Sequence, residues 1–157
     1  MKKFELTNEF ITNMFGTKLF RIRALVEFGD VEAGELGGYV EKESNLGHDD
    51  NAWVYGNARV YGNAWVYGNA LVCSDEDYAY AHGFGSVNRT TTFFRLKDGG
   101  VGVRCGCFYG TLAQFRDKIR ETHGETKKAQ EYLMLADLME LRFEEDENEV
   151  GYRKYVE

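Results

Sequence analysis

A six-residue repeat constrains this chain more than any other feature. Residues 51–72 read NAWVYGNARVYGNAWVYGNALV, in which Val, Ala, Gly and Asn each recur every six residues. An α-helix would repeat its apolar positions every three or four residues, and a single long strand would not carry Gly-Asn at regular corners. The pattern predicts short strands that alternate with sharp bends.

Each position of the repeat has a chemical reason. Val suits a buried strand site, Ala suits a tight inward corner, and Gly and Asn tolerate the unusual backbone of a bend. The residues beside the valines are expected to point outward, and an exposed aromatic row usually marks a contact surface. The residues expected on this docking wall are Trp53, Tyr55, Arg59, Tyr61, Trp65 and Tyr67.

The repeat resembles the hexapeptide repeat of left-handed parallel β-helices, in which three units form one triangular coil. The pattern is strict over residues 51–72, weakens upstream through Leu46, Val40 and Leu36, and ends at 73–77. The resemblance implies about two coils, and it implies a homo-oligomer, with a trimer favoured. A coil this short is expected to lean on other elements or on other subunits to cover its open edges.

The flanking segments predict a fold that is mainly β with an α+β C-terminal part. Alternating apolar residues predict a strand over residues 20–26, whereas residues 4–14 fit either a strand or a helix. Residues 77–89 are Gly-rich and aromatic and are expected to form a crossing segment. A β-hairpin is expected next, with strands 90–96 and 101–107 around the Asp98-Gly99 turn, followed by helices over 112–122 and 125–143.

These elements divide the chain into four regions. They are an N-terminal strand region (1–33), a short β-helix (34–77), a unit of hairpin and two helices (78–143) and an acidic tail (144–157). The tail begins EEDENE, and it is expected to be solvated, although GYRKYV within it could form a late strand.

Composition excludes some classes of function. The chain has 157 residues, 26 of them acidic and 19 basic, and its net charge of −7 argues against general nucleic-acid binding. No apolar run is long enough to cross a bilayer, so we expect a cytoplasmic protein without a membrane partner. The three cysteines are expected to be thiols.

Five arginines are the candidate ligand-binding residues. They lie on or beside predicted strands of an acidic chain, and guanidinium groups bind phosphates through paired hydrogen bonds. If the strands share a sheet, a nucleotide-type ligand could bind there beside an aromatic ring. The alternative is that these side chains pair with ordinary surface carboxylates such as Asp98. The five are Arg21, Arg23, Arg89, Arg95 and Arg104.

Other chemistry receives weaker support from the sequence. Many left-handed β-helix enzymes transfer acyl groups with a loop histidine as base, and His48 is the one candidate here for that role. Cys105 and Cys107 are expected to be buried thiols rather than zinc ligands, because zinc sites favour wider spacing and a second Cys pair. We therefore expect no catalytic residue, no metal and no cofactor.

Most of the chain, about residues 18–143, also resembles small YGNA-repeat proteins of phages, prophages and gut bacteria. The matching elements include RIRAL, GELGGYVEKE, the YGNA array, CGCFYGTLAQF and ETHG. This resemblance implies an origin in mobile elements but no settled activity. We expect a non-catalytic oligomeric interaction protein in the host cytoplasm, with counter-defence as a plausible task, by blocking a host immune protein or sequestering a nucleotide signal. An acyltransferase and a structural assembly protein are the alternatives.

Overall fold

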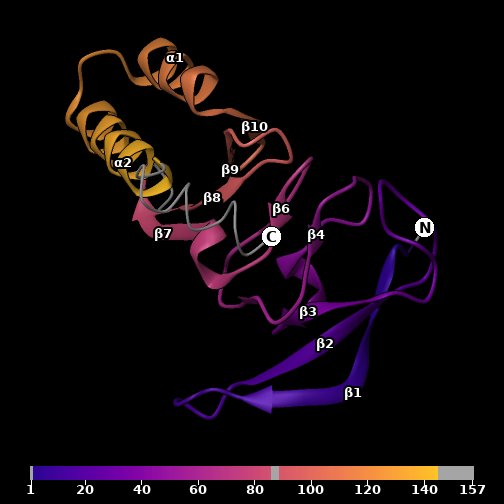
Figure 1. Ribbon diagram of the computed structural model, residues 1–157. Helices are drawn as coiled ribbons and strands as arrows, with labels where there is room; N and C mark the ends of the chain where they lie inside the picture. Colours follow the sequence, from indigo (N-terminus) through magenta and orange to yellow (C-terminus); the bar gives the residue numbers. More distant parts are fainter. Residues whose placement is uncertain (1, 86–88, 145–157) are drawn as a thin grey trace.

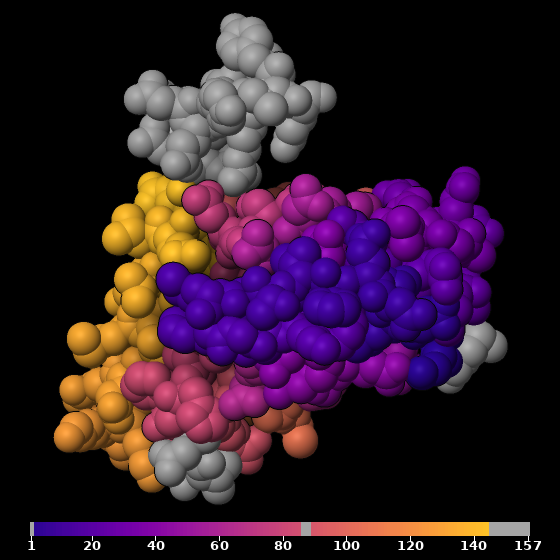
Figure 2. All heavy atoms as spheres, turned by 90° about the horizontal axis from the view of Figure 1, so that it is seen from below, coloured from indigo at the N-terminus to yellow at the C-terminus, as the bar shows by residue number. Residues whose placement is uncertain are grey.

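The computed structural model describes residues 2–85 and 89–144 as a mainly β chain with two C-terminal helices. The N-terminal hairpin lies at one end of the molecule, the helices lie at the other, and the repeat lies between them (Figure 1). Seen from below, the N-terminal residues form an indigo band across the near face of the molecule (Figure 2). The tail beyond Glu144, including GYRKYV, lies outside the described residues.

The N-terminal segment is a hairpin that pairs with the repeat region. Strand β1 (Phe4–Thr12) runs antiparallel to β2 (Lys18–Ala24), which settles residues 4–14 as mainly strand. Strand β2 then pairs antiparallel with β3 (Leu36–Val40), and β3 pairs in parallel with β5 (Arg59–Val60). The hairpin therefore covers the edge of β3 that faces away from the repeat.

Parallel contacts join successive turns of the chain through the repeat. Strand β4 (Trp53–Val54) pairs in parallel with β6 (Leu71–Val72). Three parallel contacts stack apolar residues: Val40 on Val60, Leu46 on Val66 and Val54 on Val72. The paired residues are 20 positions apart in the first two contacts and 18 positions apart in the third. Leu36, which a uniform period places on the inner face, is consequently 55% exposed.

The inner face and the corners of the repeat follow the expected chemistry. The four valines at positions 54, 60, 66 and 72 are fully buried, and the four alanines are at most 2% exposed. At each corner the Ala amide donates to the Tyr carbonyl three residues before it. The intervening Gly56, Gly62 and Gly68 have φ of 58°, 67° and 71°, a left-handed conformation that glycine adopts without strain.

The second sheet is antiparallel and has the order β10-β9-β8-β7. Its strands are β7 (Tyr78–Phe84), β8 (Arg89–Arg95), β9 (Val101–Cys105) and β10 (Phe108–Thr111). The prediction of a crossing segment over 77–89 is wrong, because most of that segment is β7, which pairs with β8. The expected strand 101–107 ends at Cys105, where a two-residue turn leads directly into β10.

Two helices pack on this sheet. Helix α1 (Leu112–His123) begins at the Thr111 cap, as expected, and α2 (Lys127–Phe143) begins at the Thr126 cap. Their inner faces bury Phe115, Ile119, Tyr132 and Met139 against Phe93 of the sheet. Two short 3₁₀ turns, η1 (Glu43–Asn45) and η2 (Asp75–Asp77), complete the described elements.

Two hydrophobic clusters result, one in the repeat region and one between the second sheet and the helices. They meet where Leu96 forms an antiparallel bridge with Ala70 and where Phe94 packs into the first cluster. The Lys97 amide donates to the Asn69 carbonyl beside that bridge, at 3.0 Å. One face of the second sheet therefore lies against the repeat, and the opposite face lies against the helices.

Candidate functional site

The five candidate arginines do not gather in one place. Arg21 donates to the carbonyl oxygens of Gly37 and Gly56, at 2.7 and 3.3 Å, and its guanidinium lies over the Tyr39 ring. Arg21 also pairs with Glu9 across the N-terminal hairpin. These contacts tie the hairpin to the repeat, so they give Arg21 a structural role.

Two more of the five have partners within the fold. Arg23 pairs with Glu5 on the exposed face of the hairpin. Arg95 donates from Nε to the buried Asp77 carboxylate at 3.2 Å and lies over the Phe143 ring. For Arg23 and Arg95 the structure therefore supports the ordinary alternative, in which an arginine pairs with a carboxylate of the fold.

Arg89 and Arg104 come together beside the repeat. They line a shallow cavity of about 220 Å³ between the second sheet and residues 63–65 of the repeat. Arg104 projects from the face of β9 that packs on the repeat. Arg89 is the first residue of β8, at the same end of the sheet. The residues that line this Arg89–Arg104 cavity are Asn63, Trp65, Arg89, Thr90, Thr92, Arg104 and Gly106.

The Arg104 side chain is held between aromatic rings. The central carbon of its guanidinium lies 4.1 Å from the ring centroid of Trp65 and 4.5 Å from that of Tyr67. Trp65 and Tyr67 contact each other edge to face, and Tyr67 in turn packs on Tyr109. Such stacking fixes the plane of a guanidinium without consuming its N–H donors. Arg104 is therefore oriented before any ligand arrives.

One donor of Arg104 is buried and has no hydrogen-bond partner. Its Nε–H is shielded from solvent, and no acceptor lies within hydrogen-bond distance among the described residues. Buried polar groups are normally paired, and each exception asks for an explanation. Because this Nε–H is closed to solvent, an anion that enters the cavity would act on the guanidinium through its charge rather than through Nε.

Arg89 approaches the cavity across a glycine. A Cβ atom built on Gly106 would lie 1.7 Å from Nη1 of Arg89, so a larger residue in this turn would displace the guanidinium. Gly106 also has a φ of 58°, which its place in the two-residue turn requires. The Gly-Cys turn between β9 and β10 therefore leaves room for Arg89 at the sheet end.

Hydroxyl and amide groups complete the cavity wall. The Thr92 hydroxyl accepts a hydrogen bond from the Trp65 amide at 3.0 Å, which fixes the repeat against the sheet. The Thr90 hydroxyl lies 2.7 Å from Nδ1 of His82 on the neighbouring strand. Residue type alone does not distinguish these threonines or Asn63 as site residues, although alternation within TTTFFR places Thr90 and Thr92 on one face of β8.

The electrostatics of the cavity favour an anion. Within residues 2–85 and 89–144, neither Arg89 nor Arg104 forms an ion pair with a carboxylate. Two adjacent unpaired guanidinium groups repel each other, and an anion between them would relieve that repulsion. Among the described residues that line the cavity, the charged side chains are the two arginines, and the others are polar, aromatic or glycine.

The expected docking wall is only partly exposed. Trp53 is fully buried, so the prediction that it points outward is wrong. Its indole packs edge to face on Phe4 and Phe28, which belong to the N-terminal region. Tyr61 and Trp65 are 40% and 37% exposed, Arg59 is exposed, and Tyr55 and Tyr67 are half-buried. The chain's own C-terminal sheet covers part of this wall at Trp65 and Tyr67.

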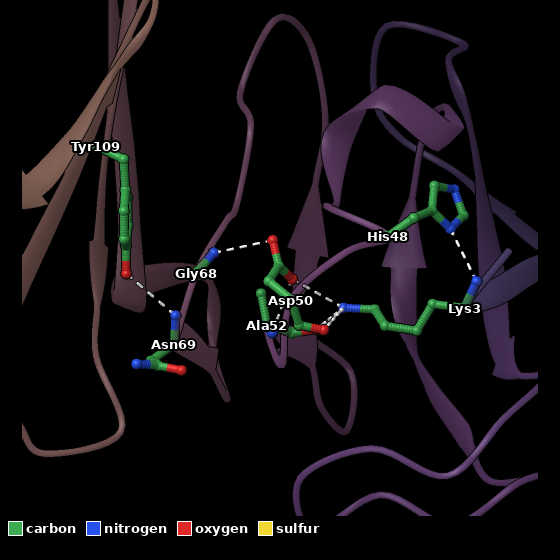
Figure 3. Close-up of polar contacts among 7 residues, drawn as sticks. All are labelled: Lys3, His48, Asp50, Ala52, Gly68, Asn69 and Tyr109. Atoms are coloured by element: carbon green, nitrogen blue, oxygen red, sulfur yellow. Dashed lines mark hydrogen bonds and ion pairs between the residues drawn. The ribbon is translucent and has the colours of Figure 1, made fainter. Parts of the chain in front are cut away.

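His48 belongs to a structural network (Figure 3). Its Nδ1 accepts a hydrogen bond from the Lys3 amide at 3.1 Å, and its ring stacks on Phe4. Burial lowers the pKa of His48. The Lys3 ammonium beside it is buried against Asp50, whose second carboxylate oxygen accepts from the Gly68 amide. The network ties the N-terminal segment to two turns of the repeat.

The cysteines are not the buried pair expected from the sequence. Cys107 is exposed because it lies in the turn after β9, and Cys105 is half-buried. The Thr91 hydroxyl donates to Cys105 Sγ at 3.2 Å. Across the described part of the chain, no three His, Cys, Asp or Glu side chains gather as metal ligands would.

Comparison of the chain with protein-family models, with curated proteins and with solved structures finds no match. Neither described helix combines the length and the apolar character that crossing a bilayer requires. The geometry of the Arg89–Arg104 cavity is therefore the main indication of function.

Proposed function

We propose that this chain is a non-catalytic binding protein that takes up a small organic phosphate in the Arg89–Arg104 cavity. The observation that carries the proposal is the stacked Arg104 guanidinium, whose buried Nε has no acceptor and which lies beside Arg89 without a carboxylate. Two guanidinium groups can bind a phosphate through several charge-assisted hydrogen bonds. Thr90 and Asn63 at the wall add neutral groups that could bind a sugar or the remaining phosphate oxygens.

A phosphate attached to a flat ring fits the surroundings better than phosphate alone. Trp65 is 37% exposed, so part of its indole is open to a second planar group. Stacking on such a surface adds to the electrostatic attraction. A nucleoside monophosphate is therefore the probe of choice, with inorganic phosphate as the simpler comparison.

Calorimetric titration with AMP and with inorganic phosphate tests the proposal. Loss of one charge-assisted contact costs about 1.5–3 kcal/mol, so Arg104→Gln and Arg89→Gln should each weaken binding by about tenfold or more. Arg23→Gln is the matched control, because it removes one exposed arginine on the other sheet and should leave binding unchanged. Absence of binding by both probes to the unaltered protein, or an equal loss in the control, would overturn the proposal.

We also propose that the repeat region forms about two coils of a left-handed parallel β-helix. The support is the stacking of Val40, Leu46 and Val54 on Val60, Val66 and Val72 by three successive parallel contacts. An experimental structure tests the proposal, and a coil of the opposite hand or a flat sheet would contradict it.

We propose a biological setting that is consistent with this binding role. A protein of phage type that holds a phosphorylated small molecule without converting it would act by sequestration, which fits counter-defence in a host cytoplasm. We propose a homotrimer as the assembled form, with the exposed Tyr61 and Arg59 of the repeat as available contact residues. Native mass spectrometry of protein from its host would report the subunit number and any carried ligand together.

The geometry of His48 favours binding over acyl transfer. A general base needs an accessible nitrogen, but Nδ1 of His48 already accepts the Lys3 amide proton. The other nitrogen lies 4.0 Å from the Glu43 carboxylate, in a ring stacked on Phe4. The contacts of His48 are therefore those of a residue that holds the N-terminal segment in place.

A further inference from the structure

A second cavity lies on the opposite face of the same sheet. It has a volume of about 270 Å³ and opens between the sheet end and helix α1, on the side where the helices pack. Its floor is apolar and well packed, since Phe115 and Ile119 are 1% and 6% exposed. Phe108 of β10 forms part of the wall and packs on Phe115. We call this space the helix-side cavity.

The rim of the helix-side cavity carries three cationic or ionisable nitrogen groups. Arg89, Lys118 and His123 all line it, and none of the lining residues that the structure describes is acidic. Lys118 has one carboxylate neighbour, Glu121, at 3.8 Å, and both of those side chains are largely exposed. The His123 ring stacks on the buried Tyr132, which sets the ring against the inner wall.

The polar groups at the base of this cavity are already satisfied within the protein. Thr91 donates to Cys105 Sγ, and the Tyr132 hydroxyl lies 3.8 Å from the same sulfur. A ligand therefore has little to gain from hydrogen bonds at the floor. Affinity there would come from covering the half-buried Phe108 ring, and from placing an anion at the rim.

We propose that the helix-side cavity is a second binding site, and that it takes a small aromatic acid. The ring of such a ligand would cover Phe108 and Ile119, and its carboxylate or sulfonate would face Lys118 and Arg89. Neither a purely apolar ligand nor a simple inorganic anion would use both halves of this lining. The floor of this site, Lys118 and His123 do not belong to the Arg89–Arg104 cavity, and Arg89 is the residue that the two linings share.

The two sites share Arg89, which makes them compete. Along β8, side chains alternate between the two faces of the sheet, so Thr92 faces the repeat and Thr91 faces the helices. Arg89 stands at the end of the strand and lines both cavities. A single guanidinium cannot give its full set of donors to anions on both faces at once. Occupation of one site should therefore weaken the other.

Fluorescence titration with 8-anilinonaphthalene-1-sulfonate, a fused aromatic ring with one sulfonate, tests the second site. Thr122 is an exposed residue of α1 that lines the opening, so Thr122→Phe should fill it and abolish most of the fluorescence gain. Ala113→Phe adds the same ring at another exposed, uncharged position of α1, which is not part of the lining, and should leave binding intact. Equal loss in both variants, or no loss in Thr122→Phe, would overturn the second site.

Charge variants separate the two cavities. Lys118→Gln should weaken binding of the sulfonate by about two- to fivefold, as expected for an exposed ion pair, and should leave phosphate binding unchanged. Lys128→Gln, which removes one charge from the exposed first turn of α2, is the matched control. Arg104→Gln should weaken phosphate alone, whereas Arg89→Gln should weaken both ligands.

Competition is measured by repeating the sulfonate titration at a saturating concentration of phosphate. The dissociation constant of the sulfonate should rise several-fold in the unaltered protein and should not change in Arg89→Gln. An unchanged constant in the unaltered protein would contradict the sharing of Arg89. The sulfonate titration by itself requires no phosphate, so failure of phosphate binding and failure of the second site are distinguishable.

Discussion

Lys3 and Asp50 form the most buried ion pair among the described residues, with side chains 2% and 10% exposed. Burial lowers the pKa of Lys3, and the Asp50 carboxylate opposes that shift. Asp50→Ala would leave the ammonium buried without its counter-charge, so we expect a loss of about 3–5 kcal/mol in the free energy of unfolding. Urea denaturation measures the loss.

The exposed pair Lys97–Asp30 is the control for this prediction, because its side chains are 63% and 74% exposed. Asp30→Ala should cost about 0–1 kcal/mol, since exposed ion pairs contribute little. If Asp50→Ala were no more destabilising than Asp30→Ala, the Lys3 network could not be what fixes the N-terminal segment on the repeat.

His48 should make the stability depend on pH. Burial lowers its pKa in the folded protein, so the unfolded chain binds a proton more readily. Stability is therefore complete above the ordinary histidine pKa of about 6.5, and it is lost as pH falls from there towards the folded value. His48→Asn keeps an acceptor for the Lys3 amide but does not titrate, so it should lose less stability between pH 7 and pH 5. Urea denaturation measures the free energy of unfolding at each pH. An equal loss between pH 7 and pH 5 in both proteins would contradict this assignment.

At the scale of elements, the corners of the repeat offer a matched pair of glycines. Gly56 and Gly68 have similar positive φ, but an added Cβ meets nothing within 4 Å at Gly56, whereas at Gly68 it would lie 1.9 Å from the Tyr109 hydroxyl. Gly56→Ala should cost about 1–2 kcal/mol from backbone strain alone. Gly68→Ala should cost clearly more, because Tyr109 must leave its hydrogen bond to the Asn69 amide.

Thermal unfolding of both variants measures the difference, and a Tyr109→Ala background provides the check. With the Tyr109 ring removed, the two alanine substitutions should cost nearly the same. A difference that persisted in that background would mean that something other than the contact with Tyr109 distinguishes the two corners.

The elements that the sequence predicted well are those whose pattern is local. The Val and Ala positions, the glycine corners and both helices depend on periodicity and capping, which neighbouring residues carry. Strand β7 and the burial of Trp53 depend on distant partners, namely β8 and the rings of Phe4 and Phe28. No local period reports such contacts, which is why both predictions failed.

The candidate site shows the same division. The arginines could be chosen from the sequence by residue type, but their grouping depends on which strands share a sheet face. Arg21 and Arg104 lie in different sheets, and only the antiparallel pairing of β8 with β9 brings Arg89 and Arg104 to one cavity. The stacking of Arg104 on Trp65 requires the packing of that sheet on the repeat, which nothing in the spacing of the two residues indicates.

At the scale of the whole molecule, the junction between the two hydrophobic clusters decides whether the chain unfolds as one unit. The junction combines the Ala70–Leu96 bridge, the hydrogen bond from Trp65 to Thr92 and the stacking of Arg104. The chain has two tryptophans, and Trp53 lies in the first cluster. Trp65→Phe keeps an aromatic ring under Arg104 and leaves Trp53 as the single indole reporter of the repeat region.

In Trp65→Phe, fluorescence follows the first cluster, whereas circular dichroism at helical wavelengths follows α1 and α2, which pack in the second. If the junction couples the clusters, the two signals should give one denaturation midpoint, as two-state unfolding requires. Arg104→Ala in the same background removes the stacked guanidinium, and the fluorescence and dichroism midpoints should then begin to separate. Two well-separated midpoints in Trp65→Phe itself would show that the repeat and the helical unit fold independently, and that the Arg89–Arg104 cavity lies between separate bodies.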